Sequence, residues 1–198
     1  MLYHASEQRS GAKFEMKTKA TAGIAAGIVL VLGSGCSSAN KPTNENFTNT
    51  LNAYYQDHND CLFPHGHTFP YEVAPGAAAK EDKKEMDSLT DAGMLTRLED
   101  RDMHVDRYTL NAAGNRFAPR FCYGHRQVTG IESFTPPAPH NGFTETTVTY
   151  HYAMMDVPMW ANTDEVKVAF PQVGKSLGAT PTDQATLATV GAGWQVPQ

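Results

Sequence analysis

Long apolar runs are scarce in this chain of 198 residues. The longest run, residues 20–32, has 13 residues, whereas a membrane-spanning helix needs about 20. Basic residues are also few, with 16 Lys and Arg against 21 Asp and Glu. An acidic chain repels the phosphates of nucleic acids and of anionic lipids. These shortages argue against a membrane-spanning helix and against a nucleic-acid partner.

Sequence motifs of catalysis are missing as well. The stretch "GKS" that begins at Gly174 matches the end of a phosphate-binding loop, but Ala169 stands where the loop needs its first glycine. The chain has no Gly-x-Ser-x-Gly sequence. Asp164 and Glu165 are expected in an exposed helix, where solvation accounts for them. We therefore predict no enzymatic activity and no cofactor, and keep a hydrolase with an unrecognised site as an alternative.

Residues 16–35 have the layout of a secretory signal. Lys17 and Lys19 precede the apolar run, and small residues follow it. Residues 1–15 are polar and fit poorly before a signal, so we predict that Met16 is the natural start and that residues 1–15 are an over-long start. The alternative is a cytoplasmic extension before a single anchor helix.

The sequence "GSGC" that ends at Cys36 resembles the lipobox of bacterial lipoproteins, in which the signal is cut before a cysteine that becomes lipidated. Gly33 stands in the place of the usual leucine. The resemblance implies a lipid on Cys36, a flexible tether over residues 36–45 and an anchored protein that faces the periplasm. Ser37 favours the outer over the inner membrane. A competing cut after Ala39 would instead release a soluble periplasmic protein.

Cysteine is rare, with three residues in the chain. If Cys36 carries lipid, Cys61 and Cys122 remain, and an even pair in an oxidising compartment is most simply a disulfide. Such a bridge would close a loop of about 60 residues and contribute on the order of 4 kcal/mol. From Cys36 onward the chain has 12 basic and 19 acidic residues, hence a formal charge of −7. This charge again disfavours nucleic acid as a partner.

Two helices are predicted in the first half of the domain. In residues 44–60 the apolar side chains recur at intervals of three and four, which is typical of an amphipathic helix: Phe47, Leu51, Tyr54 and Tyr55. A second helix is expected to begin at Lys80 in a charged stretch and to stop near Gly93. The proline-rich segment between them is predicted to be an ordered loop, with a short strand over residues 69–73.

Residues 89–117, "LTDAGMLTRLEDRDMHVDRYTLNAAGNRF", carry the second helix into two short strand-like runs, 95–99 and 106–110. A helix, "AGML", a strand, a loop and a strand ending in "YTLNAAG" resemble the C-terminal half of winged-helix domains. Acidic residues outnumber lysines on the helix, and this opposes docking on phosphates. The resemblance therefore implies a local fold and no DNA binding.

The second half of the domain has the composition of β-structure. Two segments rich in Val, Thr, Tyr and Phe flank "PPAPHNG", which predicts a hairpin with a long, proline-containing loop. A short helix near residues 159–171, a closing strand, a glycine turn and a final strand over 194–196 are expected to follow. The sequence thus predicts one α+β domain over residues 46–198. In it, N-terminal helices and a winged-helix-like segment (46–118) precede a small antiparallel β-sheet (119–198).

Three histidines form the candidate metal site. His65 and His67 are close in sequence, and the predicted disulfide would draw His125 toward them. Three imidazoles would suit Zn or Cu. A second set of residues offers soft ligands for Cu(I), although methionine more often fills cores: His151, Met154, Met155 and Met159.

The sequence predicts an exported, lipid-anchored envelope protein with a non-catalytic binding or assembly role. Its expected partners are the membrane, through the lipid on Cys36, and an envelope protein. The alternatives are a periplasmic metal-binding protein that uses His65, His67 and His125, and the hydrolase named above.

Overall fold

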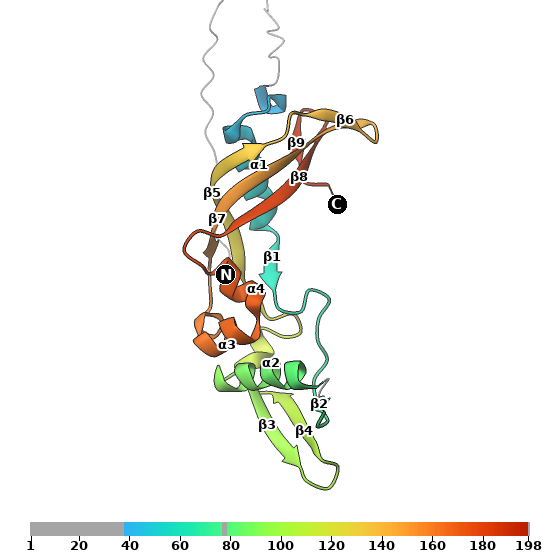
Figure 1. Ribbon diagram of the computed structural model, residues 1–198, viewed down its shortest axis with the longest axis vertical. Coiled ribbons are helices and arrows are strands. Elements are labelled where there is room, and N and C mark those ends of the chain that lie inside the picture. Colours follow the sequence, from blue (N-terminus) through green and yellow to red (C-terminus); the bar gives the residue numbers. More distant parts are fainter. Residues whose placement is uncertain (1–37, 77–78, 198) are drawn as a thin grey trace, which may run out of the picture. The chain divides into compact units, whose positions relative to one another are not determined.

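The computed structural model describes residues 38–76 and 79–197 (Figure 1). The chain divides into two units, residues 1–35 and 36–198, and every described residue belongs to the second. The predicted signal peptide, the over-long start and Cys36 therefore lie outside the described residues. Within the described part, no helix is both long and apolar enough to cross a bilayer.

A six-stranded antiparallel sheet dominates the domain. Its strands are β1 (Asn59–Cys61), β5 (Cys122–Phe134), β6 (Ala138–His140), β7 (Phe143–Met155), β8 (Thr182–Val190) and β9 (Gly193–Gln195). Their order is β1-β5-β7-β8-β9, and β6 pairs with the start of β7. The predicted hairpin is confirmed as β5 and β7, and the predicted closing strands are β8 and β9. Figure 1 shows the long strands curling past helix α1 (Asn44–Gln56).

Helix α1 forms because a capping residue and an apolar stripe coincide. The Thr43 hydroxyl accepts the Asn46 backbone N–H at 3.3 Å, which satisfies a donor that has no partner within the helix. Phe47 and Leu51 are fully buried against the sheet. They form, with six sheet residues, what we name the α1 cluster: Phe47, Leu51, Val128, Val148, Tyr150, Tyr152, Leu187 and Trp194.

Residues 62–121, which we name the insert, leave and rejoin the six-stranded sheet at neighbouring points. The disulfide between Cys61 and Cys122 closes this segment, as predicted. Backbone hydrogen bonds continue the pairing beyond the bridge, from Leu62 N to Phe121 O at 3.1 Å and from Phe63 N to Arg120 O at 3.1 Å. The two ends of the insert are therefore held side by side.

The insert has its own small sheet. It contains β2 (Tyr71–Val73), α2 (Lys80–Asp91), β3 (Leu95–Asp100), β4 (Val105–Leu110) and the short 3₁₀ turn η2 (Gly114–Arg116), with strand order β2-β4-β3. The predicted helix from Lys80 and the two predicted strands are confirmed. Gly93 follows the helix end at φ +75°, a left-handed conformation that glycine adopts without steric cost.

A second apolar cluster joins the insert to the segment between β7 and β8. That segment holds η3 (Met159–Asn162), α3 (Asp164–Ala169) and α4 (Pro171–Ser176), while η1 (Ser38–Asn40) precedes α1. Trp160, Val166 and Phe170 pack with Leu89, Phe121 and further insert residues in this cluster. The predicted helix near 159–171 is thus split into three short turns, because Thr163 caps α3 and Pro171 begins α4.

The predicted fold class is wrong. The described chain is mostly β, with a six-stranded and a three-stranded antiparallel sheet and only four short helices. N-terminal helices do not form a layer, because α1 lies against β5 and β9 while α2 belongs to the insert. The local order that the winged-helix resemblance implies, a helix followed by two strands, is present as α2, β3 and β4, and β2 pairs with β4 as a third strand. These elements belong to the insert and not to an N-terminal helical half.

Candidate functional site

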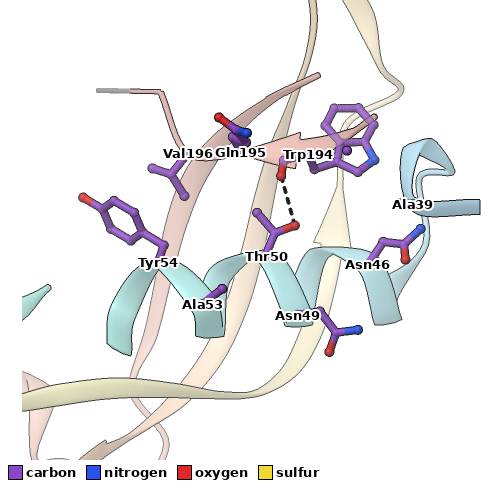
Figure 2. Close-up of a pocket in the computed structure, with 10 residues that line it drawn as sticks. Ala39, Asn46, Asn49, Thr50, Ala53, Tyr54, Trp194, Gln195 and Val196 are labelled. Atoms are coloured by element: carbon purple, nitrogen blue, oxygen red, sulfur yellow. Dashed lines mark hydrogen bonds between the residues drawn. The ribbon is translucent and has the colours of Figure 1, made fainter. Parts of the chain in front are cut away.

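A groove of two adjoining pockets follows helix α1. The first, which we name the α1–β9 pocket, has a volume of about 540 Å³. Five α1 residues line it, and Figure 2 shows Thr50 directed toward Trp194 of the C-terminal segment: Asn46, Asn49, Thr50, Ala53 and Tyr54. Intervals of three, one, three and one place these residues on one side of a helix. The facing wall is formed by Gly193, Trp194, Gln195 and Val196.

Two hydrogen bonds fix β9 beside α1. The Thr50 hydroxyl donates to the Trp194 backbone oxygen at 3.3 Å, the dashed line in Figure 2. The Trp194 indole N–H donates to the Lys41 backbone oxygen at 3.3 Å, and its ring meets Phe47 edge-on with 5.2 Å between centroids. The pocket therefore has a rigid floor, since Trp194 is buried.

The second pocket, which we name the Arg126 pocket, has a volume of about 630 Å³. Tyr54 and Val196 line both pockets, so the two adjoin. One wall is the end of α1 with the start of β1, and the other is the edge of β8. The remaining lining residues are Tyr55, His58, Asn59, Asp60, Arg126, His140, Asn141, Glu145, Gln184, Ala185, Thr186 and Pro197.

Arg126 ties the two edge strands together across this pocket. Its Nε donates to Asp60 on β1 at 2.7 Å, and its Nη1 donates to Asp183 on β8 at 2.6 Å. The guanidinium carbon also lies 4.8 Å from the ring centroid of Tyr152 and 5.3 Å from that of Tyr55, which favours the cation. Burial disfavours the cation, but the bond and charge of Asp60 prevail and raise the pKa of Arg126.

Two tyrosines complete the Arg126 network. The hydroxyl oxygens of Tyr55 and Tyr150 are 2.5 Å apart, and Arg126 Nη1 donates to the Tyr150 hydroxyl at 3.2 Å. Burial raises the pKa of Tyr150, and the hydrogen bond that it shares with Tyr55 raises it further. Burial also raises the pKa of Tyr55. Both phenols therefore stay protonated at neutral pH and serve as hydrogen-bonding groups rather than as bases.

An aromatic pair marks the point where the two pockets meet. The rings of Tyr54 and His58 stack with 3.8 Å between centroids and 13° between planes. His58 Nδ1 lies 2.6 Å from the Tyr54 backbone oxygen, so the imidazole is held at the end of α1. This pair offers a flat surface to anything that lies along the groove.

The structure does not bring the three predicted metal ligands together. His65 is exposed, whereas His67 lies among aromatic rings, 4.6 Å from Phe63 and 4.6 Å from Tyr71 between centroids. His125 stands opposite Asn59 on β1 and pairs with Asp156, with Nδ1 and Oδ2 3.4 Å apart. Across residues 38–76 and 79–197, no three His, Cys, Asp or Glu side chains are grouped so as to hold a metal ion.

The soft-ligand set is dispersed in the same way. His151 bonds the Thr182 hydroxyl, with Nδ1 and Oγ1 3.0 Å apart. Met154 packs against the apolar clusters, and Met159 is almost wholly exposed in η3.

The Arg126 network is what sequence reasoning missed. Asp60 and Asp183 lie 66 and 57 residues from Arg126, so no local spacing links them. The available signal was a lone arginine inside the predicted β-segment "HRQVTGIESFT", because a buried arginine needs carboxylate partners.

Comparison of the chain with protein-family models, curated proteins and solved structures finds no match.

Proposed function

We propose that the protein is exported, anchored in the cell envelope by a lipid on Cys36, and acts there without catalysis by binding an envelope partner in the groove beside α1. The observation that carries the binding role is the groove itself. Its floor is fixed by Trp194 and its far end by Arg126, and its combined walls offer amides, hydroxyls and aromatic rings. Preformed grooves with a few convergent polar groups are the usual form of binding sites.

The Cys61–Cys122 disulfide supports the exported location. Disulfides persist in oxidising compartments and are rare in the cytosol. The boundary between the two units of the chain falls between Gly35 and Cys36, where processing is predicted. The described residues begin at Ser38, within the predicted tether, where η1 (Ser38–Asn40) precedes α1. A lipid at Cys36 would then place the groove close to the membrane, because Ala39 lines the α1–β9 pocket.

The chemistry of the groove supports binding over catalysis. The carboxylates of Asp60 and Asp183 are engaged by Arg126, and the phenols of Tyr55 and Tyr150 are held neutral. A catalytic acid or base must exchange its proton near neutral pH, whereas the two phenols keep theirs and both carboxylates are occupied by Arg126. The hydrolase and metal-binding alternatives have no specific observation in their favour.

Intact mass spectrometry tests the anchor. Protein recovered from membranes should have a mass that begins at Cys36 and includes acyl chains. The Cys36→Ala variant should lose the acyl chains and leave the membrane fraction. A wild-type mass that begins at Asn40, or that retains residues 1–35, would reject the lipid anchor.

Site-specific photo-crosslinking in the intact envelope tests the binding role. A photo-reactive residue at Ala53 in the α1–β9 pocket, or at Thr186 in the Arg126 pocket, should give a discrete crosslinked envelope component. Thr96 is the matched control, because it is exposed on β3 in the insert. If the groove positions crosslink no more than Thr96 does, the groove is not the binding surface.

A further inference from the structure

The outer edge of β8 is only partly paired. On one side, β7 pairs with β8 from Thr182 to Ala188. On the other side, β9 pairs with Ala188, Thr189 and Val190 alone. Among the described residues, residues 182–187 thus have no strand on their outer side. Such an edge presents a row of backbone donors and acceptors that another strand can complete.

The chain's own last strand cannot complete this edge. Gln195 pairs with Ala188, and in the same register Val196 and Pro197 would face Leu187 and Thr186. Proline has no backbone N–H and ends a ladder. The strand therefore stops after Gln195, and the open stretch of β8 begins where it stops.

β8 also lacks the devices that usually protect an edge. Natural edge strands carry lysine, proline or a bulge against unwanted pairing, and the sequence of β8, "TDQATLATV", has neither lysine nor proline. Its pairing with β7 runs from Thr182 to Ala188 without a bulge. The Gln184 backbone N–H donates instead to the side chain of Asp183 at 2.8 Å, a local bond that a partner strand could replace.

The open edge faces the Arg126 pocket. Gln184, Ala185 and Thr186 form one wall of the pocket, and the end of α1 with β1 forms the other. A wall opposite the edge leaves room for a single extended chain but obstructs the approach of a second sheet. This geometry favours a polypeptide segment over another copy of this domain.

Charge selects the kind of segment. Glu145 lines the same pocket, is half-buried, and takes part in none of the ion pairs that the described residues form. Asp60 is offset by Arg126. The uncompensated carboxylate of Glu145 favours a basic side chain on the occupant.

We propose that the Arg126 pocket receives an extended segment of a partner polypeptide, which adds to β8 as a strand along residues 182–187 and places a Lys or Arg against Glu145. This proposal rests on the binding role proposed above and names the chemistry of the partner. Strand addition draws its affinity from main-chain hydrogen bonds and therefore tolerates many sequences. A designed strand can therefore stand in for the partner in the test.

The probe is the strand Thr-Val-Lys-Val-Thr, joined to the C-terminus of the chain by a Gly/Ser linker of about ten residues. The tether supplies a millimolar effective concentration. Backbone amide hydrogen exchange should slow by about tenfold or more at alternate residues of 182–187, because successive amides of a strand point to opposite edges. Exchange in β3 and β4 should not change, which verifies that the fusion is folded.

Two matched probes and one concentration series complete the test. A Thr-Pro-Lys-Pro-Thr probe cannot form a ladder, so equal protection by this probe overturns strand addition, as does no protection by the first probe. Equal amide protection by a Thr-Val-Glu-Val-Thr probe would overturn the preference for a basic side chain. So would equal protection by the lysine probe in the wild-type chain and in the Glu145→Gln variant. Protection that rises with protein concentration without any probe makes a second copy the occupant. The exchange results do not depend on the mass-spectrometry and crosslinking results. If strand addition is rejected, the proposed binding role is therefore still tested by crosslinking.

Discussion

Arg97 in the insert and Arg126 in the six-stranded sheet each pair with two aspartates, but they differ in how exposed their side chains are. Arg97 pairs with Asp87 at 2.9 Å and with Asp106 at 3.1 Å, and Arg126 pairs with Asp60 and Asp183. A tyrosine hydroxyl joins each set. The Arg97 side chain is 40% exposed and that of Arg126 is 17% exposed. The same set of ion pairs thus lies at the surface in the insert, whereas in the six-stranded sheet it links two strands.

The groups around Arg97 are charged and shared, whereas those around Arg126 include aromatic rings. Lys83 shares Asp87 and Asp106 with Arg97, so several exposed side chains can replace one another. Arg126 has Tyr55 and Tyr152 against its face and no second cation in its ion pairs. Water screens the exposed guanidinium of Arg97, whereas that of Arg126 is largely shielded from it. Burial, and not the number of ion pairs, decides which arginine the fold depends on.

The largest expected effect comes from breaking the covalent link between the two regions. Cys61→Ala with Cys122→Ala opens the loop that encloses the insert, and the free energy of unfolding should fall by about 4 kcal/mol in the chain-entropy account. Urea unfolding measures the loss, and amide exchange should show that β2, β3 and β4 loosen before β5 and β7 do. Cys36→Ala is the control that removes a cysteine without opening the loop. A loss below about 1 kcal/mol would mean that the apolar clusters alone hold the insert.

The second prediction compares the two arginines directly. Arg126→Met leaves two carboxylates without their cation and should cost about 3 kcal/mol, whereas Arg97→Met should cost about 1 kcal/mol or less. Chemical unfolding of the two variants side by side gives both numbers. Raising the salt to 1 M should shrink the Arg97 effect and leave most of the Arg126 effect. Equal costs would contradict the role assigned to burial.

The smallest predicted effect concerns His67 in the insert. Burial lowers the pKa of His67 below its ordinary value of 6.5, although Asp82 opposes the shift. The unfolded chain therefore binds a proton at a higher pH than the folded chain, and stability should decline as the pH falls through about 6.5. His67→Phe should flatten this slope in melting temperature between pH 7.5 and pH 5, and His65→Phe is the exposed control. An unchanged slope in His67→Phe would assign the decline to other groups.

Local patterns in the sequence predicted most individual elements. The intervals of Phe47 and Leu51 gave α1, and Gly93 marked the end of α2. Residues 146–152 alternate in the sequence, and Thr146, Val148, Tyr150 and Tyr152 are all buried on one face of β7. The even pair of cysteines gave the disulfide. Each of these signals lies within a few residues or depends on counting alone.

The arrangement of the elements could not be predicted in the same way. β1 pairs with β5 across the whole insert, and β2 joins β4 across α2. Short strands such as "NDC" and "YEV" have no periodicity of their own and form because a partner strand is present. The helical patterns in residues 44–118 therefore predicted a half built mainly of helices. Pairing between strands that are distant in sequence forms sheets there instead. The Arg126 pocket could not be predicted for the same reason, since the residues that line it come from five separate segments.

The covalent loop has a consequence for how the protein survives damage. Because Cys61 and Cys122 are joined, any single cut by a protease between residues 62 and 121 leaves one covalent molecule instead of two pieces. The exposed turn between β3 and β4, which carries Met103 at its surface, could be nicked without releasing either α1 or the long strands. Such a nick would be visible on a gel only after the bridge is reduced.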